Sequence, residues 1–321
     1  MEKFVFFGGK GGVGKTTVSS AYGLRCAREG LATLVVSTDP AHSTSDVFDQ
    51  QFTDDPSPVE GIDGLHVMEI DPDDELERHL METKRAMGDQ VSPAMVNEID
   101  RQIEMAHQTP GAYEAALFDR FVDVMRNAEG YDRVVFDTSP TGGTLRLLSL
   151  PQFLQGWVER LRHKRERSVR LYERAAIGKQ EPRRTREGDP ILARLQERKE
   201  QFEFAADTLQ NRAAFFLVVN PDELSIRETR RAIESLADHD LGVRGLAVNR
   251  LTPEPDPDED GRGARFLRDR VATERERLEE LHETFDAPVV AEIETRISEV
   301  KGDLLDEVAA ELDVPVRPAE A

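Results

Sequence analysis

Cysteine is almost absent from this sequence: Cys26 is the only one among 321 residues. A lone cysteine excludes both an internal disulfide framework and a thiolate metal cage. Long apolar runs are missing too, since no stretch approaches the roughly 20 residues that cross a bilayer as a helix. The opening run Lys3–Phe7 ends at Gly8 and lacks the layout of a signal peptide. We therefore expect a cytoplasmic protein.

Lysine is scarce as well: only eight of the 42 basic residues are lysine, against 63 acidic residues and a net charge of −21. Such a surface could repel acidic partners, or it could be an adaptation to molar intracellular salt, which screens self-repulsion to within about 3 Å at 1 M. We favour the halophilic adaptation. Both interpretations argue against a nucleic-acid partner, because phosphate contacts need a basic face.

Short β-branched or aromatic runs alternate with longer helical patterns along the chain. This alternation predicts an α/β fold with a mostly parallel sheet flanked by crossover helices. Continuous apolar runs are typical of strands that are covered on both faces. The predicted strands are Lys3–Phe7, Ala32–Ser37, Leu65–Ile70, Arg133–Asp137, Ala214–Asn220, Val243–Asn249 and Pro288–Val290.

Two stretches break this alternation. Residues 71–129 read as three helices with no strand between them, and residues 150–212 read as two long helices joined by a polar linker, Gly178–Pro190. We expect both stretches to form a helical subdomain inserted in a single domain of residues 1–321. Residues 252–263 form a third interruption, predicted to be a mobile loop because they are rich in acidic residues, proline and glycine.

One motif carries chemistry. Residues Gly9–Thr16 fit G-x-x-x-x-G-K-[ST] and lie between an apolar strand and a helical pattern. The glycines of such a P-loop let backbone N–H groups wrap phosphates, and the helix N-terminus adds its positive end. Lys15 is predicted to reach the β- and γ-phosphates of ATP, and Thr16 to bind Mg²⁺. The sequence therefore predicts a P-loop NTPase.

An additional lysine early in this loop, Lys10, marks the deviant Walker A variant of dimerising, SIMIBI-type ATPases. In that variant the lysine points across the subunit interface at the partner's nucleotide, in a role like that of an arginine finger. A trans cation of this kind is worth roughly 10³–10⁵ in rate in the GTPases. The alternative is a solvated loop lysine. The first interpretation predicts a homodimer.

Two aspartates follow predicted strands, where carboxylates face the ligand crevice of a parallel sheet. Asp39 is predicted to orient or deprotonate the attacking water beside the metal, and the alternative is a helix cap before Pro40. Asp137 ends an apolar strand, where a Walker-B carboxylate approaches Mg²⁺ through water. The predicted metal site thus comprises Thr16, Asp39 and Asp137.

Five segments together resemble the ArsA/GET ATPase family, which includes arsenite-pump ATPases and the cytosolic ATPase that targets tail-anchored membrane proteins. The resemblance covers the whole chain in order. It implies an ATP-hydrolysing homodimer of α/β domains with helical subdomains, which open and close with ATP. The segments are Gly8–Thr17, Ser37–His42, Asp137–Pro151, Asn220–Arg231 and Val248–Leu251.

The resemblance also assigns roles to residues. It implies that Lys10 is the trans lysine, Asp39 the hydrolytic aspartate and Asp137 the aspartate of the second switch. Catalysis is expected to depend on Asp39, Lys10 and Lys15. Asn249 matches the family's adenine-binding asparagine, with a turn asparagine as the alternative. The full set of predicted nucleotide-binding residues is Gly9, Lys10, Gly11, Gly12, Val13, Gly14, Lys15, Thr16, Thr17, Asn220, Pro221 and Asn249.

Three departures from the family pattern limit this transfer. Gly143 stands where the second switch usually has a histidine. The acidic residues 252–263 replace the Cys-x-x-Cys that binds zinc between subunits of the targeting ATPases. Cys26, predicted to be a core residue, cannot supply the several thiols that arsenite activation uses.

The main functional prediction is a switch ATPase that binds and targets the transmembrane segments of tail-anchored clients. An arsenical pump-driving subunit with a membrane pump as partner is the second hypothesis, and a positioning ATPase similar to MinD and ParA is the third. Residues 160–186 hold eleven Lys or Arg and form either a solvated face or a contact for anionic lipid headgroups or an acidic partner.

Methionines support the client hypothesis, because methionine adapts to varied apolar partners. Five of the seven lie in the first insertion, although ordinary core packing explains them equally well. A client groove would also use Phe153 and Trp157 of the second insertion. The five methionines are Met81, Met87, Met95, Met105 and Met125.

Overall fold

The computed structural model describes residues 2–38, 43–71, 73–78, 81, 112–137 and 190–316, together with residues 156, 159, 160, 163, 164 and 167. These residues form an eight-stranded sheet in the order β3-β4-β2-β5-β1-β6-β7-β8. All neighbours pair in parallel except β3 and β4. The strands are β1 Phe4–Gly9, β2 Thr33–Ser37, β3 Ser57–Pro58, β4 Leu65–Glu69, β5 Arg133–Asp137, β6 Ala213–Val219, β7 Val243–Leu251 and β8 Val289–Glu294.

The predicted α/β fold with a mostly parallel sheet is therefore confirmed, and each predicted strand overlaps an observed one. β3 escaped prediction because it has only two residues, one of them Pro58. β7 runs two residues past the predicted end at Asn249, and β8 continues to Glu294 through alternating buried and exposed positions. The longer β7 places Asn249 inside a strand rather than at its end.

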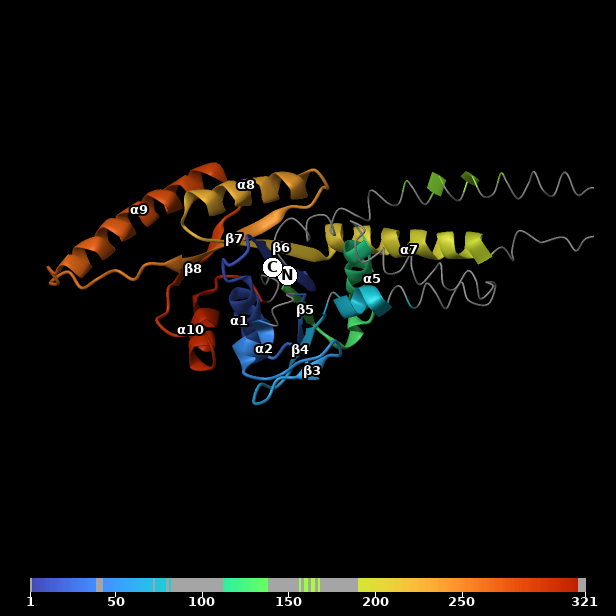
Figure 1. Cartoon of the computed structure of the whole chain (residues 1–321), viewed down its shortest axis with the longest axis horizontal. Helices are drawn as coiled ribbons and strands as arrows, with labels where there is room; N and C mark the ends of the chain where they lie inside the picture. The colour runs from blue at the N-terminus through green and yellow to red at the C-terminus, as the bar shows by residue number, and fades with distance from the viewer. Residues whose placement is uncertain are drawn as a thin grey trace, which may run out of the picture.

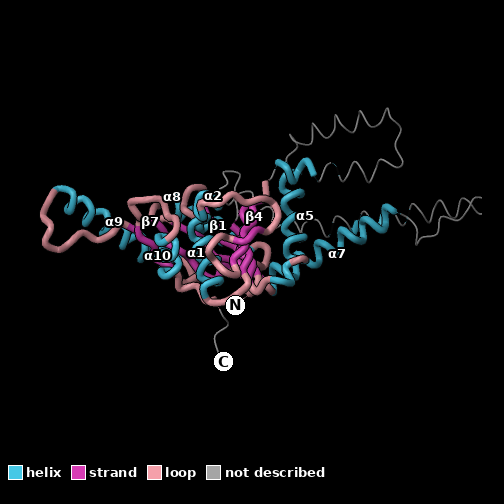
Figure 2. The backbone as a smooth tube through the Cα atoms, turned by 90° about the horizontal axis from the view of Figure 1, so that it is seen from below, coloured by secondary structure: helices cyan, strands magenta, loops and turns pink. Residues whose placement is uncertain are grey.

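Alternate residues of the central strand face opposite layers, as a period of two requires. Val5 and Phe7 belong to a core cluster with α1 and α10, whereas Phe4 and Phe6 belong to one with α5 and α7. Figures 1 and 2 show these layers on either side of the sheet, with α2 beside α1 and with α8 and α9 over β6 and β7. The helices are α1 Lys15–Arg28, α2 Ser43–Phe48, α5 Ala112–Arg126, α7 Pro190–Asn211, α8 Glu223–Ala237, α9 Arg262–Thr284 and α10 Asp303–Glu311, with a 3₁₀ turn η1 at Ala128–Gly130.

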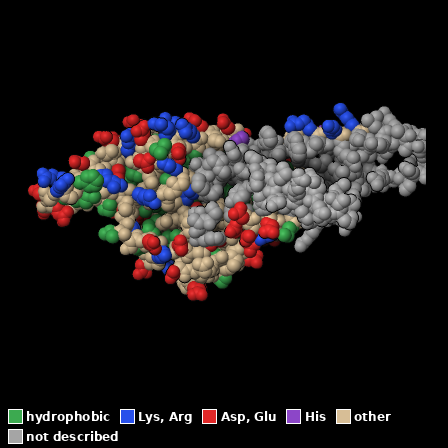
Figure 3. Space-filling model, in the orientation of Figure 1, with side chains coloured by type: hydrophobic (Ala, Val, Ile, Leu, Met, Phe, Trp, Pro, Cys, Tyr) green, Lys and Arg blue, Asp and Glu red, His purple; other side chains and the backbone are tan. Residues whose placement is uncertain are grey.

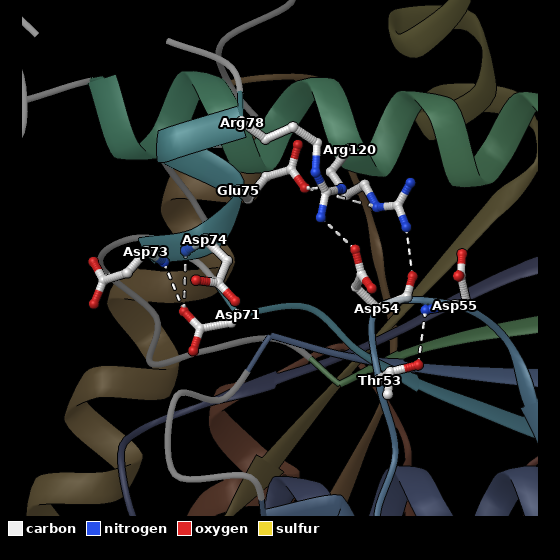
Figure 4. Close-up of polar contacts among 9 residues, drawn as sticks. All are labelled: Thr53, Asp54, Asp55, Asp71, Asp73, Asp74, Glu75, Arg78 and Arg120. Carbon is white, nitrogen blue, oxygen red and sulfur yellow. Dashed lines mark hydrogen bonds and ion pairs between the residues drawn. The ribbon is translucent and has the colours of Figure 1, made fainter. Parts of the chain in front are cut away.

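An ion cluster attaches both described ends of the first insertion to one loop. Arg78, on a helix of residues 73–78, forms ion pairs with Asp54 and Glu75. Arg120 of α5 donates to the Asp54 carbonyl oxygen and lies 3.9 Å from the Glu75 carboxylate. Figure 4 shows the two guanidinium groups converging on this loop, just before β3. Residues 72, 79, 80 and 82–111 of the first stretch, and most of stretch 150–212, lie outside the described part of the chain.

Two predicted boundaries differ from the structure by one or two residues. α7 begins at Pro190, which the sequence assigned to a linker, because proline suits the first turn of a helix. α9 begins at Arg262, so the acidic loop ends at Gly261. Arg268 of α9 donates to the carbonyl oxygens of three loop residues, Asp256, Pro257 and Glu259.

Charges of both signs cover the visible surface of the described core, and basic side chains gather over α8 (Figure 3). Within the residues described, no helix is long and apolar enough to cross a membrane.

Candidate nucleotide site

The P-loop lies between β1 and α1, pressed against β6 and β7. Gly9 has φ +147°, and a Cβ there would meet the Val218 carbonyl oxygen at 2.4 Å. Gly14 has φ +93° and caps α1, and a Cβ there would meet the Asn249 Nδ2 at 2.2 Å. Both positions therefore require glycine for backbone conformation and for space.

The ends of the loop offer positive groups to an anion. The Lys15 side chain is buried, and its Nζ donates to the Lys10 carbonyl oxygen at 3.1 Å across the loop. The first intrahelical bond of α1 runs from Val18 N–H to Gly14 O, so the N–H groups of the preceding turn are the ones a helix leaves for a phosphate. Gly11 and Gly12 are exposed at the tip of the loop. This arrangement fits a nucleoside triphosphate.

Asp137 lies deep at the carboxyl edge of the sheet, next to the loop. It is only 1% exposed and pairs in register with Phe7 of β1 and Ser37 of β2. Ser37 Oγ donates to Asp137 Oδ2 at 3.4 Å, and Thr38 N–H donates to the Asp137 carbonyl oxygen at 3.3 Å. Asp39 follows Thr38 in the sequence and lies outside the described residues, as do residues 138–150.

The oxygen ligands beside the P-loop suit Mg²⁺. Magnesium is usually held by one or two carboxylates together with substrate phosphates and water. The half-buried Thr16 hydroxyl and the Asp137 carboxylate would hold it, and no group of three or more His, Cys, Asp or Glu in the described ranges forms a separate metal cage. When bound with ATP, the ion neutralises charge on the β- and γ-phosphates.

Two asparagines flank the loop on its other side. Asn249 is 8% exposed, and its Nδ2 donates to the Val13 carbonyl oxygen at 2.7 Å. Asn220 follows β6 and, with Pro221, is half-buried; among the described residues its side-chain Oδ1 has no hydrogen-bond partner. The structure thus brings Asn220 and Asn249 to the same sheet edge as the loop, and their contacts with a base remain predictions.

Sequence reasoning missed Glu69, at the carboxyl end of β4. This carboxylate is 5% exposed and accepts from Ser45 N–H at 2.9 Å and from Ser45 Oγ at 2.6 Å. Its own N–H donates to the Thr53 carbonyl oxygen at 2.8 Å. Ser45 belongs to α2, the first described element after Asp39. The available signal was an acidic residue between Met68 and Ile70 in an otherwise apolar run.

Cys26 is fully buried on α1, which confirms the prediction of a core residue. Burial raises the pKa of its thiol to about 11, because desolvation disfavours the thiolate.

Comparisons with known proteins point to an ATPase family. The model of a family described as anion-transporting ATPase matches residues 2–313. A putative arsenical pump-driving ATPase 2 of Aquifex aeolicus is 32% identical over 87% of this chain and 88% of the relative. A putative arsenical pump-driving ATPase of Halobacterium salinarum is 33% identical over 97% of this chain, which spans only 44% of that relative. ATPase GET3A of Arabidopsis thaliana is 31% identical over 94% of this chain and 80% of the relative.

Proposed function

The chain belongs to the anion-transporting ATPase family and hydrolyses ATP with Mg²⁺, and from that premise we propose that it is a homodimeric switch that binds and targets the transmembrane segments of tail-anchored clients. The single observation that carries this choice is the state of Cys26. It is the only thiol in the chain and it is fully buried. A switch for metalloids needs several accessible thiolates to bind its ligand, whereas the surface that binds an apolar segment needs none.

The pump-driving hypothesis keeps the fold and the nucleotide chemistry but lacks a ligand set in this chain. Soft metalloid ions favour thiolates. With its pKa raised to about 11, the Cys26 thiol is protonated at neutral pH, and one sulfur cannot form a multidentate site. The names of the two arsenical relatives keep this hypothesis as the alternative.

A positioning ATPase of the MinD and ParA kind gains no support from α10. A C-terminal amphipathic helix free to bind a membrane would favour that hypothesis. The apolar side of α10, formed by Leu305, Val308 and Ala309, is buried in the core cluster that contains α1. The segment after it is buried as well, at Val314 and Val316.

The attachment of the first insertion supports a switch that acts on clients. Glu69 N–H bonds to Thr53, and the next residue, Asp54, anchors both Arg78 and Arg120. Asp54, which anchors the insertion, is therefore adjacent to Thr53, the residue hydrogen-bonded to the end of β4. The same end of β4 holds α2 through Glu69. A nucleotide-dependent shift of α2 would reach the insertion through this short path.

Of the five methionines, Met87, Met95 and Met105 lie outside the described residues. Met125 of α5 is 6% exposed and packs in the core, so it is not part of a client surface. Met81 is 46% exposed at the start of the insertion. Burying an apolar client side chain on such a surface contributes about 1.5–3 kcal/mol. A transmembrane segment that buries several would offset its ordering cost.

The test is photo-crosslinking of a tail-anchor peptide that carries a photoreactive group in its apolar segment. Labelling is expected at residues 76–111 and 150–161, and it should increase with ATP in the Asp39→Asn variant, which we expect to bind ATP without turning it over. Lys15→Ala, expected to lose nucleotide, is the matched control for the ATP effect. Labelling confined to the α/β core, or equal labelling with and without ATP, would contradict client binding.

A second assay distinguishes the client-binding hypothesis from the pump-driving hypothesis. Arsenite or antimonite should leave the ATPase rate unchanged in the wild-type chain and in Cys26→Ala. Stimulation that is lost in Cys26→Ala would instead support the pump-driving hypothesis.

A further inference from the structure

We infer that Asn249 is a positioning residue for the P-loop: its side-chain amide fixes the Val13 carbonyl and thereby the N–H groups that receive the phosphates. This role is separate from the predicted contact of Asn249 with the base of the nucleotide. It goes beyond the proposed function, because it concerns how the site is kept in shape before any client or partner is present.

A β-bulge places Asn249 where it can reach the loop. The pairing of β7 with β8 shifts register around Arg250: Asn249 is opposite Ile293, and Leu251 is opposite Glu294. Arg250 adopts a left-handed conformation with φ +63°, which a residue with a side chain rarely does. Bulges bend a strand and redirect its side chains, and they are common beside active sites. The strained backbone at Arg250 therefore accompanies the bulge that directs the Asn249 side chain towards the P-loop.

The same bulge determines which end of the amide faces the loop. Arg250 N–H donates to Asn249 Oδ1 at 2.9 Å, so the oxygen is held by the chain of β7 itself. The NH₂ group must then point the other way, where it donates to the Val13 carbonyl oxygen at 2.7 Å. An aspartate, which has no donor, would set a carboxylate oxygen against that carbonyl. The site distinguishes Asn from its isosteric acid.

The Asn249 side-chain amide packs directly against the P-loop backbone. A Cβ on Gly14 would lie 2.2 Å from Asn249 Nδ2, so the amide is in contact with the backbone at Gly14. The peptide bond from Val13 to Gly14 is planar, and its C=O and N–H point in opposite directions. When Asn249 holds the C=O, it also directs the Gly14 N–H away from β7. That N–H belongs to the loop whose backbone donors bind phosphate.

The experiment compares ligands that have the phosphates but differ in the base. Binding of Mg²⁺ with ATP, GTP and inorganic tripolyphosphate would be measured by calorimetry for the wild type, Asn249→Asp and Asn249→Ala. We expect tripolyphosphate to bind about tenfold or more weakly, because a lost hydrogen bond and a new repulsion both act on the loop. ATP should weaken by at least this factor. A further change in the ratio of ATP to GTP affinity would report a separate contact of Asn249 with the base.

The matched control is Asn127→Asp. Asn127 also donates from Nδ2 to a backbone carbonyl oxygen, that of Asp123 at 2.9 Å, but it is exposed and lies just after the end of α5. It carries the same change of charge and donor, and it should leave tripolyphosphate binding unchanged. If Asn249→Ala does not fold, Asn249→Asp and amide hydrogen exchange over residues 9–17 still give an answer, with faster exchange expected.

Two results would overturn the inference. One is a loss of ATP affinity with unchanged tripolyphosphate affinity, which would assign Asn249 to the adenine base alone. The other is unchanged binding of all three ligands together with unchanged exchange over the loop. Neither result bears on client crosslinking, so the two proposals fail separately.

Discussion

Ser45 donates to Glu69 twice inside the protein, through its backbone N–H at 2.9 Å and its hydroxyl at 2.6 Å. This contact joins the end of β4 to α2, the helix that directly follows the segment carrying Asp39. Glu69→Ala leaves two buried donors without their acceptor, which costs about 1–3 kcal/mol. We expect a loss of unfolding free energy of that order in urea titrations, with a smaller loss for Glu69→Gln.

The exposed Glu60→Ala is the control for that experiment, with an expected change within about 0.5 kcal/mol. A Glu69→Ala variant as stable as Glu60→Ala would show that α2 is held by other contacts. In Glu69→Ala, kcat should fall more than the affinity for ATP does.

Asp39 and Lys15 should fail in different ways. Asp39→Asn removes the group expected to position the attacking water, so ATP should bind and hydrolysis should stall. Lys15→Ala removes a buried cation at the loop, so nucleotide affinity itself should drop. Equilibrium binding and single-turnover rates, measured at matched salt, separate the two outcomes. Hydrolysis by Asp39→Asn at the parental rate would contradict the assignment.

Lys10 is expected to act on the nucleotide of the partner subunit. Mixing Lys10→Ala with Asp39→Asn should produce heterodimers in which one composite site retains both residues. The mixture should therefore hydrolyse ATP faster than either variant alone. Equal rates, in samples shown by mass spectrometry to exchange subunits, would argue for a lysine that acts within its own subunit.

Cys26 should be nearly inert in the folded protein. With a thiol pKa of about 11, roughly one molecule in a thousand carries the thiolate at pH 8. Alkylation by iodoacetamide should be slow at pH 8, should accelerate as pH rises towards the pKa, and should become fast in denaturant. Rapid labelling of the native chain would show that the helix core around α1 opens.

The sequence was most informative where function rests on neighbouring residues. The P-loop lies within eight positions, and the type and spacing of its glycines, lysines and threonine indicate their roles. Asp137 could be predicted because it ends an apolar strand. Asn249 could be marked as a site residue, but its contact with Val13 joins positions 236 residues apart and depends on a bulge that no local pattern reveals. Glu69 was missed for the same reason, since its partner lies on another element.

Arg133 binds both ends of the described chain at once, because its guanidinium donates to the carbonyl oxygens of Glu2 and Val316. The first and last described residues are therefore held close together by one side chain. A circularly permuted gene that joins these ends and opens the chain in the exposed loop around Asp258 would keep the order of strands intact, and it would move the new termini far from the nucleotide.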